Sequence, residues 1–180
     1  MPMADHHHRL PALTLILGGA RSGKSAYAEQ LLADAPHPIY LATAQAEDSE
    51  MIDRIRQHQT RRGDRWLTVE EPFDLLGTLS LQSHPERPVL VDCLTLWLSN
   101  LLLGNAPVER EIDRLIQSLP NLSGPVVFVA NEVGLGIVPD NALARAFRDH
   151  AGRLNQMLAA RCQRVVFVAA GLPLLLKESR

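Results

Sequence analysis

Short apolar runs alternate along the chain with longer segments in which apolar residues recur at helical spacing. The runs are mostly continuous, which is typical of strands that are buried on both faces of a sheet. They predict strands at residues 13–17, 39–42, 89–92, 126–130 and 165–169. The segments between them predict helices at residues 24–33, 49–61, 74–81, 94–103, 109–119 and 141–161.

The alternation of strands with helices indicates right-handed crossover connections, so we predict an α/β fold. Its mostly parallel sheet is flanked by helices on both faces. The chain has 180 residues and no internal repeat, and neither loop-like segment, at 85–88 and 104–107, resembles a domain boundary. We therefore expect a single domain over residues 1–180, with residues 1–12 as a flexible tail. In such sheets, ligands bind beyond the carboxyl ends of the strands.

The first predicted strand runs into a glycine-rich turn, GGARSGKS, and a helical segment follows it. The turn fits the P-loop pattern, in which glycines let backbone N–H groups point at phosphate oxygens and the helix N-terminus adds partial positive charge. Lys24 would reach the β- and γ-phosphates, and the Ser25 hydroxyl would bind Mg²⁺. The fold class is then P-loop NTPase-like. We expect the whole turn to bind nucleotide: Gly18, Gly19, Ala20, Arg21, Ser22, Gly23, Lys24 and Ser25.

Besides the hydroxyl of the loop, a P-loop site needs a carboxylate near the metal ion, at the end of a nearby strand. Asp92 directly follows the apolar run of residues 89–91, so we predict that it binds Mg²⁺ or the nucleotide. The alternative is that Asp92 only caps the helix that follows it. The chain contains no Asn-Lys-x-Asp string, by which regulatory GTPases read guanine. This absence favours a phosphate-transfer enzyme over a switch protein.

The composition narrows the classes of partner. Hydrophobic residues make up 46% of the chain, charged residues 21%, and the formal net charge is −2. No overall positive field would attract nucleic acid, and no apolar run approaches the roughly 18 residues of a membrane span. The first residues lack the apolar core of a signal peptide. We therefore expect a cytoplasmic protein in which Cys93 and Cys162 are buried free thiols.

The predicted helix at 49–61 has a basic face. His58 lies four positions after Arg54. Arg61 and Arg62 follow it three and four positions later and share its face. Neighbouring cations lower the pKa of a histidine and keep its ring neutral and nucleophilic, while arginines orient phosphate oxygens. This face suits attack on a nucleotide phosphate to give a phosphoramidate. The alternative is a solvated amphipathic helix whose histidine has no chemical role.

Three further stretches change the interpretation. LATAQAEDSEM follows the second predicted strand, WLTVE follows the basic helix, and NEVGLGIVPDNALARAFRDHAGRLNQMLA follows the fourth predicted strand. Together with GGARSGKS, they closely resemble the family of bifunctional adenosylcobinamide kinase/adenosylcobinamide-phosphate guanylyltransferases of cobalamin biosynthesis. The resemblance extends over about residues 13–177, and the string at 131–156 is much more specific than the P-loop.

The resemblance implies two reactions. The enzyme phosphorylates the terminal hydroxyl of the aminopropanol arm of adenosylcobinamide with ATP or GTP. It then takes GMP from GTP onto a histidine, releases pyrophosphate, and passes the GMP to adenosylcobinamide phosphate to give adenosylcobinamide-GDP. In this family the guanylylated histidine lies on the helix after the second strand. The corresponding predicted helix of this chain, at 49–61, contains one histidine, His58. The resemblance also implies a homotrimer.

The resemblance assigns further positions to nucleotide binding. The two expected catalytic residues are His58 and Lys24. Glu70 would otherwise be interpreted as a surface acid at the end of a strand; the resemblance implies that it accepts a hydrogen bond from a ribose or base donor. The remaining positions that match the family's nucleotide site are Thr43, Ala44, Gln45, Gln59, Thr60, Arg61, Arg62 and Asp92.

Beyond the fourth predicted strand, Glu132 precedes a glycine-rich loop and is a candidate base for the kinase step, although a loose transition state needs no base. Three arginines follow on one long predicted helix: Arg145, Arg148 and Arg153. They contact the cobinamide phosphate or a neighbouring subunit, or they lie on an ordinary solvated face.

Two other functions are compatible with the P-loop. One is a kinase that acts on another small alcohol and has no guanylyl-transfer step. The other is a nucleotide sensor that binds without turnover. RNA binding is disfavoured, because the basic helix is not interleaved with aromatic residues and the net charge is −2.

Overall fold

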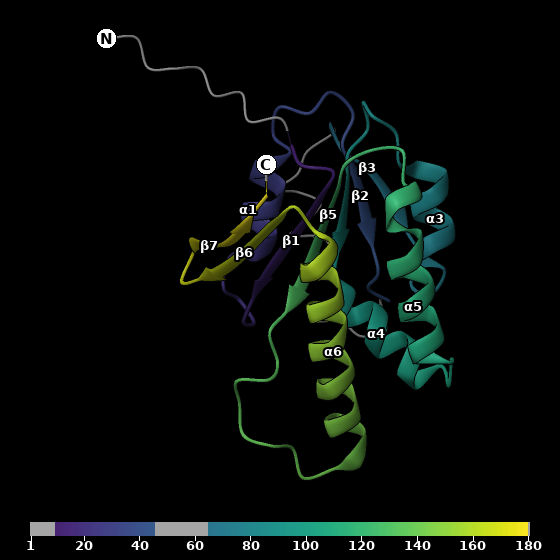
Figure 1. The fold of residues 1–180 in the computed structure, drawn as a ribbon, viewed down its shortest axis with the longest axis vertical. Helices are drawn as coiled ribbons and strands as arrows, with labels where there is room; N and C mark the ends of the chain where they lie inside the picture. Colours follow the sequence, from purple (N-terminus) through teal and green to yellow (C-terminus); the bar gives the residue numbers. More distant parts are fainter. Residues whose placement is uncertain (1–9, 46–64, 180) are drawn as a thin grey trace.

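The computed structural model describes residues 10–45 and 65–179. Within them lies one seven-stranded sheet with the strand order β3-β2-β4-β5-β1-β6-β7 (Figure 1). The strands are β1 (Leu13–Gly18), β2 (Ile39–Ala42), β3 (Leu67–Glu70), β4 (Val89–Asp92), β5 (Val126–Asn131), β6 (Arg164–Ala169) and β7 (Leu172–Glu178). The helices are α1 (Lys24–Leu31), α3 (Leu75–Gln82), α4 (Leu94–Leu103), α5 (Val108–Ser118) and α6 (Ala142–Arg161), with a short 3-10 helix η2 (Leu119–Asn121).

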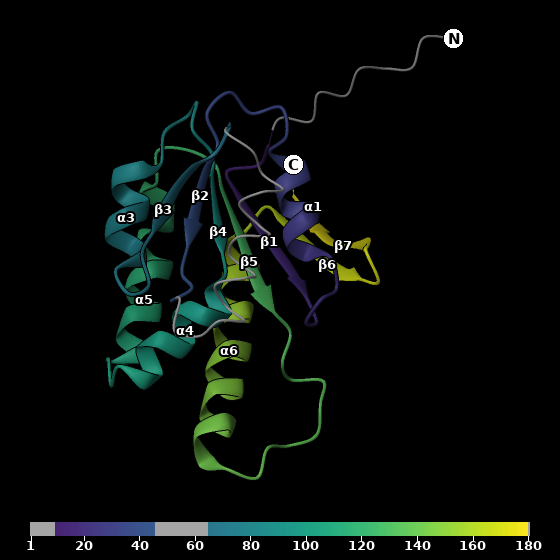
Figure 2. The ribbon, with the colours of Figure 1, turned by 180° about the vertical axis from the view of Figure 1, so that it is seen from behind.

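The described strands are parallel to their neighbours except for β7, which is antiparallel to β6. Helix α1 covers one face of the sheet, and α3, α4, α5 and α6 cover the other (Figures 1 and 2). The central strands are therefore buried from both sides. In β1, Leu15 packs into the core of the four-helix face and Ile16 into the core beside α1. The predicted α/β fold, a mostly parallel sheet flanked by helices on both faces, is confirmed.

All five predicted strands are present, with ends displaced by at most one residue. The predictions missed β3 and β7, which are the two edge strands of the described sheet. The β3 segment has the sequence LTVE, which is not a continuous apolar run. A partly exposed edge strand does not need one. The β7 segment is apolar but contains Pro173, and proline within an apolar run argues against a central strand. At a sheet edge this proline is tolerated. The predicted helix at 49–61 lies outside the described residues.

Both cysteines are buried free thiols, as predicted. Burial, followed by the negative charge of Asp92, raises the pKa of the Cys93 thiol from 9.0 to about 11. Burial also raises the pKa of the Cys162 thiol, to about 12. In the folded protein both side chains therefore remain protonated at neutral pH. Among the described residues, no helix is both long and apolar enough to cross a membrane.

We predict that neither thiol reacts with Ellman's reagent in the folded protein at about pH 8, because the reaction requires an accessible thiolate. Both thiols should react once guanidinium chloride unfolds the chain. Since the unfolded chain forms thiolates at lower pH, the free energy of unfolding should fall as the pH rises from 9.0 towards about 11. Rapid release of one equivalent of chromophore by the folded protein would contradict this prediction.

Candidate nucleotide site

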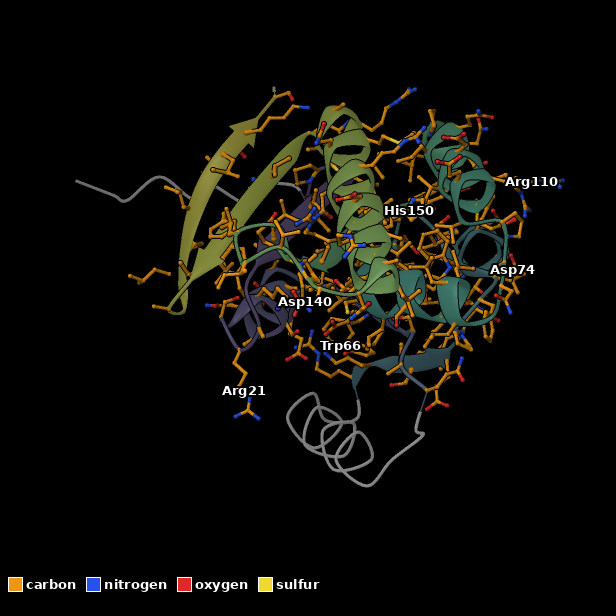
Figure 3. The ribbon with its side chains drawn as sticks, turned by 90° about the horizontal axis from the view of Figure 1, so that it is seen from below. Arg21, Trp66, Asp74, Arg110, Asp140 and His150 are labelled. Atoms are coloured by element: carbon orange, nitrogen blue, oxygen red, sulfur yellow. The ribbon has the colours of Figure 1, made fainter. Side chains whose placement is uncertain are left out.

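The P-loop curls between the end of β1 and the start of α1. Arg21 and Gly23 have positive φ angles, 55° and 97°, which turn the chain sharply. The Lys24 side chain folds back across the curl, where its Nζ donates to the Gly19 carbonyl oxygen at 2.9 Å, and the residue is only 8% exposed. The Arg21 side chain instead points outward (Figure 3). The chain itself therefore builds the curl and holds one cation inside it.

The base of the P-loop is wedged between the ends of β5 and β6. A Cβ atom at Gly18 would overlap the Val168 carbonyl oxygen and lie 2.6 Å from Ser22 Oγ. The Glu132 N–H donates to the Gly18 carbonyl oxygen at 3.0 Å. These neighbours fix the point at which the loop begins and leave room only for glycine there. Gly19, in contrast, has open space where a Cβ atom would lie.

The parallel register brings the ends of neighbouring strands to one edge of the sheet. Gly18 of β1 is level with Asn131 of β5. Asp92 of β4 is level with Ala42 of β2, which is in turn level with Glu70 of β3. Predicted site residues that are far apart in the sequence therefore share the edge at which ligands bind in this class of fold.

Asp92 does not cap the helix that follows it. The N-cap residue of α4 is Cys93, and no side chain makes a cap hydrogen bond there. The Oδ2 atom of Asp92 instead accepts a hydrogen bond from the Tyr40 hydroxyl at 2.9 Å. The Tyr40 ring stands edge-on to Trp66, with 6.2 Å between the ring centroids. Tyr40 thus orients a carboxylate at the end of β4.

Thr43 is fully buried and joins the ends of β2 and β4. Its Oγ1 donates to the Cys93 carbonyl oxygen at 2.7 Å and accepts the Cys93 N–H at 3.0 Å. On α4, the Nδ2 group of Asn100 donates to the carbonyl oxygens of Thr43 and Pro72, at 2.8 and 3.0 Å. One amide therefore ties the segment after β2 to the segment after β3, and Thr43 has a structural role of its own.

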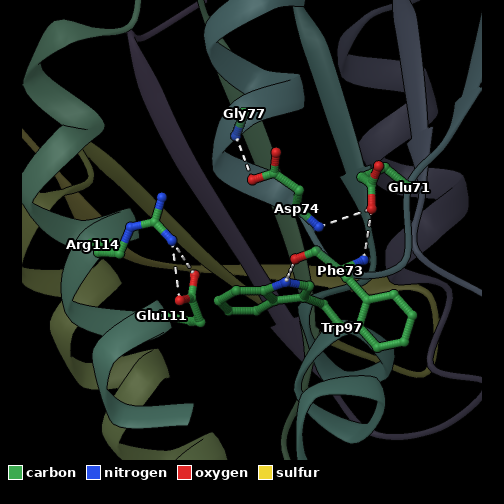
Figure 4. Close-up of polar contacts among 7 residues, drawn as sticks. All are labelled: Glu71, Phe73, Asp74, Gly77, Trp97, Glu111 and Arg114. Carbon is green, nitrogen blue, oxygen red and sulfur yellow. Dashed lines mark hydrogen bonds and ion pairs between the residues drawn. The ribbon is translucent and has the colours of Figure 1, made fainter. Parts of the chain in front are cut away.

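A second anchor lies beside the first at the end of β3. The Nε1 atom of Trp97 donates to the Phe73 carbonyl oxygen at 2.9 Å (Figure 4). Glu71 Oε1 accepts the backbone N–H groups of Phe73 and Asp74. Glu70, one position earlier, has an exposed side chain. Of these two neighbouring acids, Glu71 shapes the turn and Glu70 faces solvent at the ligand edge.

The end of β5 is linked to both α4 and α6. The Asn131 N–H donates to Thr95 Oγ1 at 2.7 Å, and Asn155 Nδ2 lies 3.5 Å from the Asn131 carbonyl oxygen. Glu132 Oε1 accepts the Gly134 N–H. The candidate base Glu132 is therefore tied to β1 through its backbone and to its own loop through its carboxylate.

The three candidate arginines of α6, Arg145, Arg148 and Arg153, make contacts within the chain. Arg145 donates to two carbonyl groups of the preceding loop, at 3.0 and 2.6 Å. Arg148 pairs with Asp149 at 3.1 Å, and Arg153 pairs with Glu109 of α5 at 3.2 Å. Asp149 and Glu109 are both exposed, so these ion pairs contribute little to stability. The Arg145 contacts hold the start of the helix against the loop.

The remaining predicted residues are distributed as follows. Ser25 lies half-buried in the first turn of α1, and Ala20 is exposed in the loop. Ala44 and Gln45 are half-buried where the chain leaves β2. The residues that lie outside the described part of the chain are His58, Gln59, Thr60, Arg61 and Arg62.

Sequence reasoning missed several residues that shape this edge, among them Tyr40, Thr95, Trp97 and Asn100. Tyr40 lies within an apolar strand, and nothing in its neighbourhood predicts a partner on β4. Asn100 offers a better signal, because it is an amide within the largely apolar helix segment LTLWLSNLLL. A partly buried polar group in such a helix needs hydrogen-bond partners.

A mostly parallel sheet whose first strand runs into a Gly-x4-Gly-Lys-Ser turn at the carboxyl edge defines a P-loop NTPase fold. The RadB recombinase shares this fold, with a TM-score of 0.51 and 19% identity over 88% of this chain and 74% of that chain. A prototypical ATPase of a bacterial type III secretion system has a TM-score of 0.54 and 11% identity, over 92% and 57%. At these identities the likeness shows the fold alone.

The family is shown by sequence. The model described as cobinamide kinase / cobinamide phosphate guanyltransferase matches residues 14–176. The bifunctional adenosylcobalamin biosynthesis protein CobP of Pseudomonas aeruginosa is 51% identical over 166 residues, which cover 91% of this chain and 96% of CobP. CobU of Salmonella typhimurium is 44% identical over 182 residues, which cover 92% and 99%. The chain belongs to the cobinamide kinase/cobinamide phosphate guanyltransferase family, and the resemblance drawn from its motifs is confirmed.

We predict that Gly18→Ala weakens GTP binding by at least about tenfold, because the added Cβ atom forces the start of the P-loop away from β6. Gly152→Ala is the control, because no atom lies within 4 Å of the added Cβ atom and the residue lies outside the P-loop, and it should bind GTP with nearly the affinity of the unaltered protein. Isothermal titration calorimetry measures both affinities. Equal losses in the two variants would contradict the wedged geometry.

Proposed function

We propose that this protein converts adenosylcobinamide to adenosylcobinamide-GDP in two transfers: phosphorylation with ATP or GTP, then guanylyl transfer from GTP. The observation that carries the proposal is the family match across residues 14–176. The relatives CobP and CobU, which are named bifunctional adenosylcobalamin biosynthesis proteins, support it because the match covers nearly their full length. The built P-loop adds support, since both transfers begin with a nucleoside triphosphate.

In the kinase step, the P-loop N–H groups and Lys24 hold the triphosphate. The cobinamide hydroxyl oxygen attacks the γ-phosphorus, the bond to the β,γ-bridging oxygen breaks, and ADP or GDP leaves. Lys24 exchanges its bond to the Gly19 carbonyl oxygen for bonds to phosphate oxygens and stabilises the developing charge. Glu132, at the end of β5 beside the loop, accepts the hydroxyl proton.

We propose that Ser25 and Asp92 supply the protein oxygens for a Mg²⁺ ion that binds together with the nucleotide. Within residues 10–45 and 65–179, no group of three or more His, Cys, Asp or Glu side chains is arranged to hold a metal ion. A Mg²⁺ ion that binds with a nucleotide needs only one or two protein oxygens, because phosphates and water supply the other ligands. The Tyr40 hydroxyl holds the Asp92 carboxylate in place. Bound there, the ion would neutralise charge on the phosphates.

In the second step, a neutral ring nitrogen of His58 attacks the α-phosphorus of GTP. The bond from the α-phosphorus to the α,β-bridging oxygen breaks, pyrophosphate leaves, and a guanylyl phosphoramidate remains. A phosphate oxygen of adenosylcobinamide phosphate then attacks the same phosphorus, and the labile P–N bond breaks. The positions proposed to bind GTP alongside His58 are Thr43, Ala44, Gln45, Gln59, Thr60, Arg61, Arg62 and Glu70.

We further propose that the protein is a single-domain cytoplasmic homotrimer. Two apolar surfaces support contacts between subunits. On β7, Leu172 and Leu174 are 72% and 61% exposed. In the loop between β5 and α6, Leu135 and Ile137 are 84% and 98% exposed. Large exposed apolar groups of this kind mark interaction surfaces.

His58→Ala should abolish transfer of the α-phosphorus label from GTP to the protein and should leave phosphorylation of adenosylcobinamide measurable. The physical reason is that this variant loses the nucleophile of the second step and keeps the phosphate loop of the first. His37→Ala, which removes an exposed histidine before β2, is the control. Covalent labelling of His58→Ala would refute the assignment of His58, and loss of labelling in His37→Ala would refute its specificity.

Lys24→Ala should lower the rates of both transfers by roughly 10²-fold or more, because one cation serves both triphosphate reactions. Arg114→Ala is the control, since it removes a surface cation whose partner is Glu111 within the same helix. Pyrophosphate release and formation of adenosylcobinamide phosphate report the two rates separately. A Lys24→Ala variant with an unimpaired kinase step would remove the P-loop from the mechanism.

A further inference from the structure

The turn between β6 and β7 contacts the P-loop directly. Ala170 and Gly171 form this two-residue turn, with φ angles of 51° and 78°. The Gly171 N–H donates to the Ser22 carbonyl oxygen at 2.8 Å. A Cβ atom on Gly23 would lie 3.1 Å from Gly171 Cα, so the turn also packs against the next residue of the loop.

The hydrogen bond fixes the orientation of one peptide plane in the loop. In a trans peptide, the carbonyl oxygen of one residue and the N–H of the next point in opposite directions. Because Gly171 holds the Ser22 carbonyl oxygen, the Gly23 N–H points away from the hairpin. That N–H is one of the donors that a P-loop offers to phosphate oxygens.

The loop conformation also needs an external support. Arg21 has a left-handed φ angle of 55°, which is unfavourable for a residue with a Cβ atom. Gly23 at φ 97° has no side chain to oppose rotation of its peptide plane. Strained conformations of this kind persist where the surrounding structure holds them. The bond from Gly171 is a contact of that kind, and it comes from the opposite end of the sequence.

We propose that Gly171 is a positioning residue for nucleotide binding: its N–H orients the Ser22–Gly23 peptide so that the Gly23 N–H points at the phosphates before the nucleotide arrives. The inference rests on the proposed role of the P-loop and adds the hairpin turn to it. Without the bond, the peptide plane samples other orientations, and binding must reorganise it.

The bond can be removed by a single-atom change. Cys162 is a natural junction for chemical ligation, so a synthetic peptide of residues 162–180 can be joined to residues 1–161. An ester in place of the amide between Ala170 and Gly171 exchanges the N–H for oxygen and changes no side chain. The all-amide protein, made by the same ligation, is the control.

We expect the ester protein to bind a non-hydrolysable GTP analogue about tenfold more weakly than the control, equivalent to about 1.4 kcal/mol. Its thermal midpoint without nucleotide should stay close to that of the control, because the change removes preorganisation of the loop and no core contact. Affinities within about twofold of each other would overturn the proposal. A lowered midpoint with unchanged affinity would overturn it too, because the bond would then be merely structural.

Two variants keep the test decisive if the ester protein does not fold. Gly171→Ala retains the N–H but strains the backbone at φ 78°, and nothing lies within 4 Å of the added Cβ atom. Gly171→Asn tolerates this φ region better. Weaker GTP binding by the alanine variant, rescued by asparagine, supports the proposal, and equal affinities contradict it.

Lys24→Ala, measured alongside, separates the two claims. If Lys24→Ala binds the analogue as tightly as the unaltered protein, the P-loop is not the nucleotide site and the proposed function fails. If Lys24→Ala is impaired and the ester protein is not, only the role of Gly171 is wrong.

Discussion

The fit of the P-loop between the ends of β5 and β6 is the constraint on which the rest of the site depends. Gly18 has no room for a Cβ atom against the Val168 carbonyl, and its own carbonyl accepts the Glu132 N–H. The start of the loop is therefore fixed by backbone packing. Lys24 then begins α1, and its cation lies across the curl, where it donates to the Gly19 carbonyl oxygen. A site for anionic phosphate follows from how the strands pack.

The other residues of the edge are placed by the same sheet and secured by α4. The parallel register sets Asp92 and Glu70 at the ends of their strands. Asn100 and Trp97 bind carbonyl groups on the segments that follow β2 and β3. The chain enters residues 46–64, which include His58, from the carboxyl end of β2, at the phosphate loop's edge of the sheet. It leaves them at the opposite edge, where the Leu67 N–H at the start of β3 donates to the Pro38 carbonyl oxygen. Only the first of the two flanks is therefore fixed at the edge that carries the phosphate loop.

Local sequence could predict the elements that have local causes. Continuous apolar runs located the central strands to within a residue, and the glycine spacing located the phosphate loop. Local sequence could not predict β3 or β7, because an edge strand needs no continuous apolar run and can contain a proline such as Pro173. Nor could it predict that Tyr40 rather than α4 would hold Asp92, because that bond joins positions 52 residues apart. The hydrogen bond from Gly171 to Ser22 could not be predicted either, because these residues are also far apart in the sequence. Long-range hydrogen bonds have no local signature, and they complete this site.

The central claim is that a triphosphate held by this loop gives its GMP to one histidine. Tandem mass spectrometry of the protein after reaction with GTP, under alkaline conditions that preserve phosphoramidates, tests it most directly. The account predicts GMP attached to His58 in the unaltered protein, with the adduct strongly reduced in Lys24→Ala. GMP on a different side chain, or an undiminished adduct in Lys24→Ala, would contradict it.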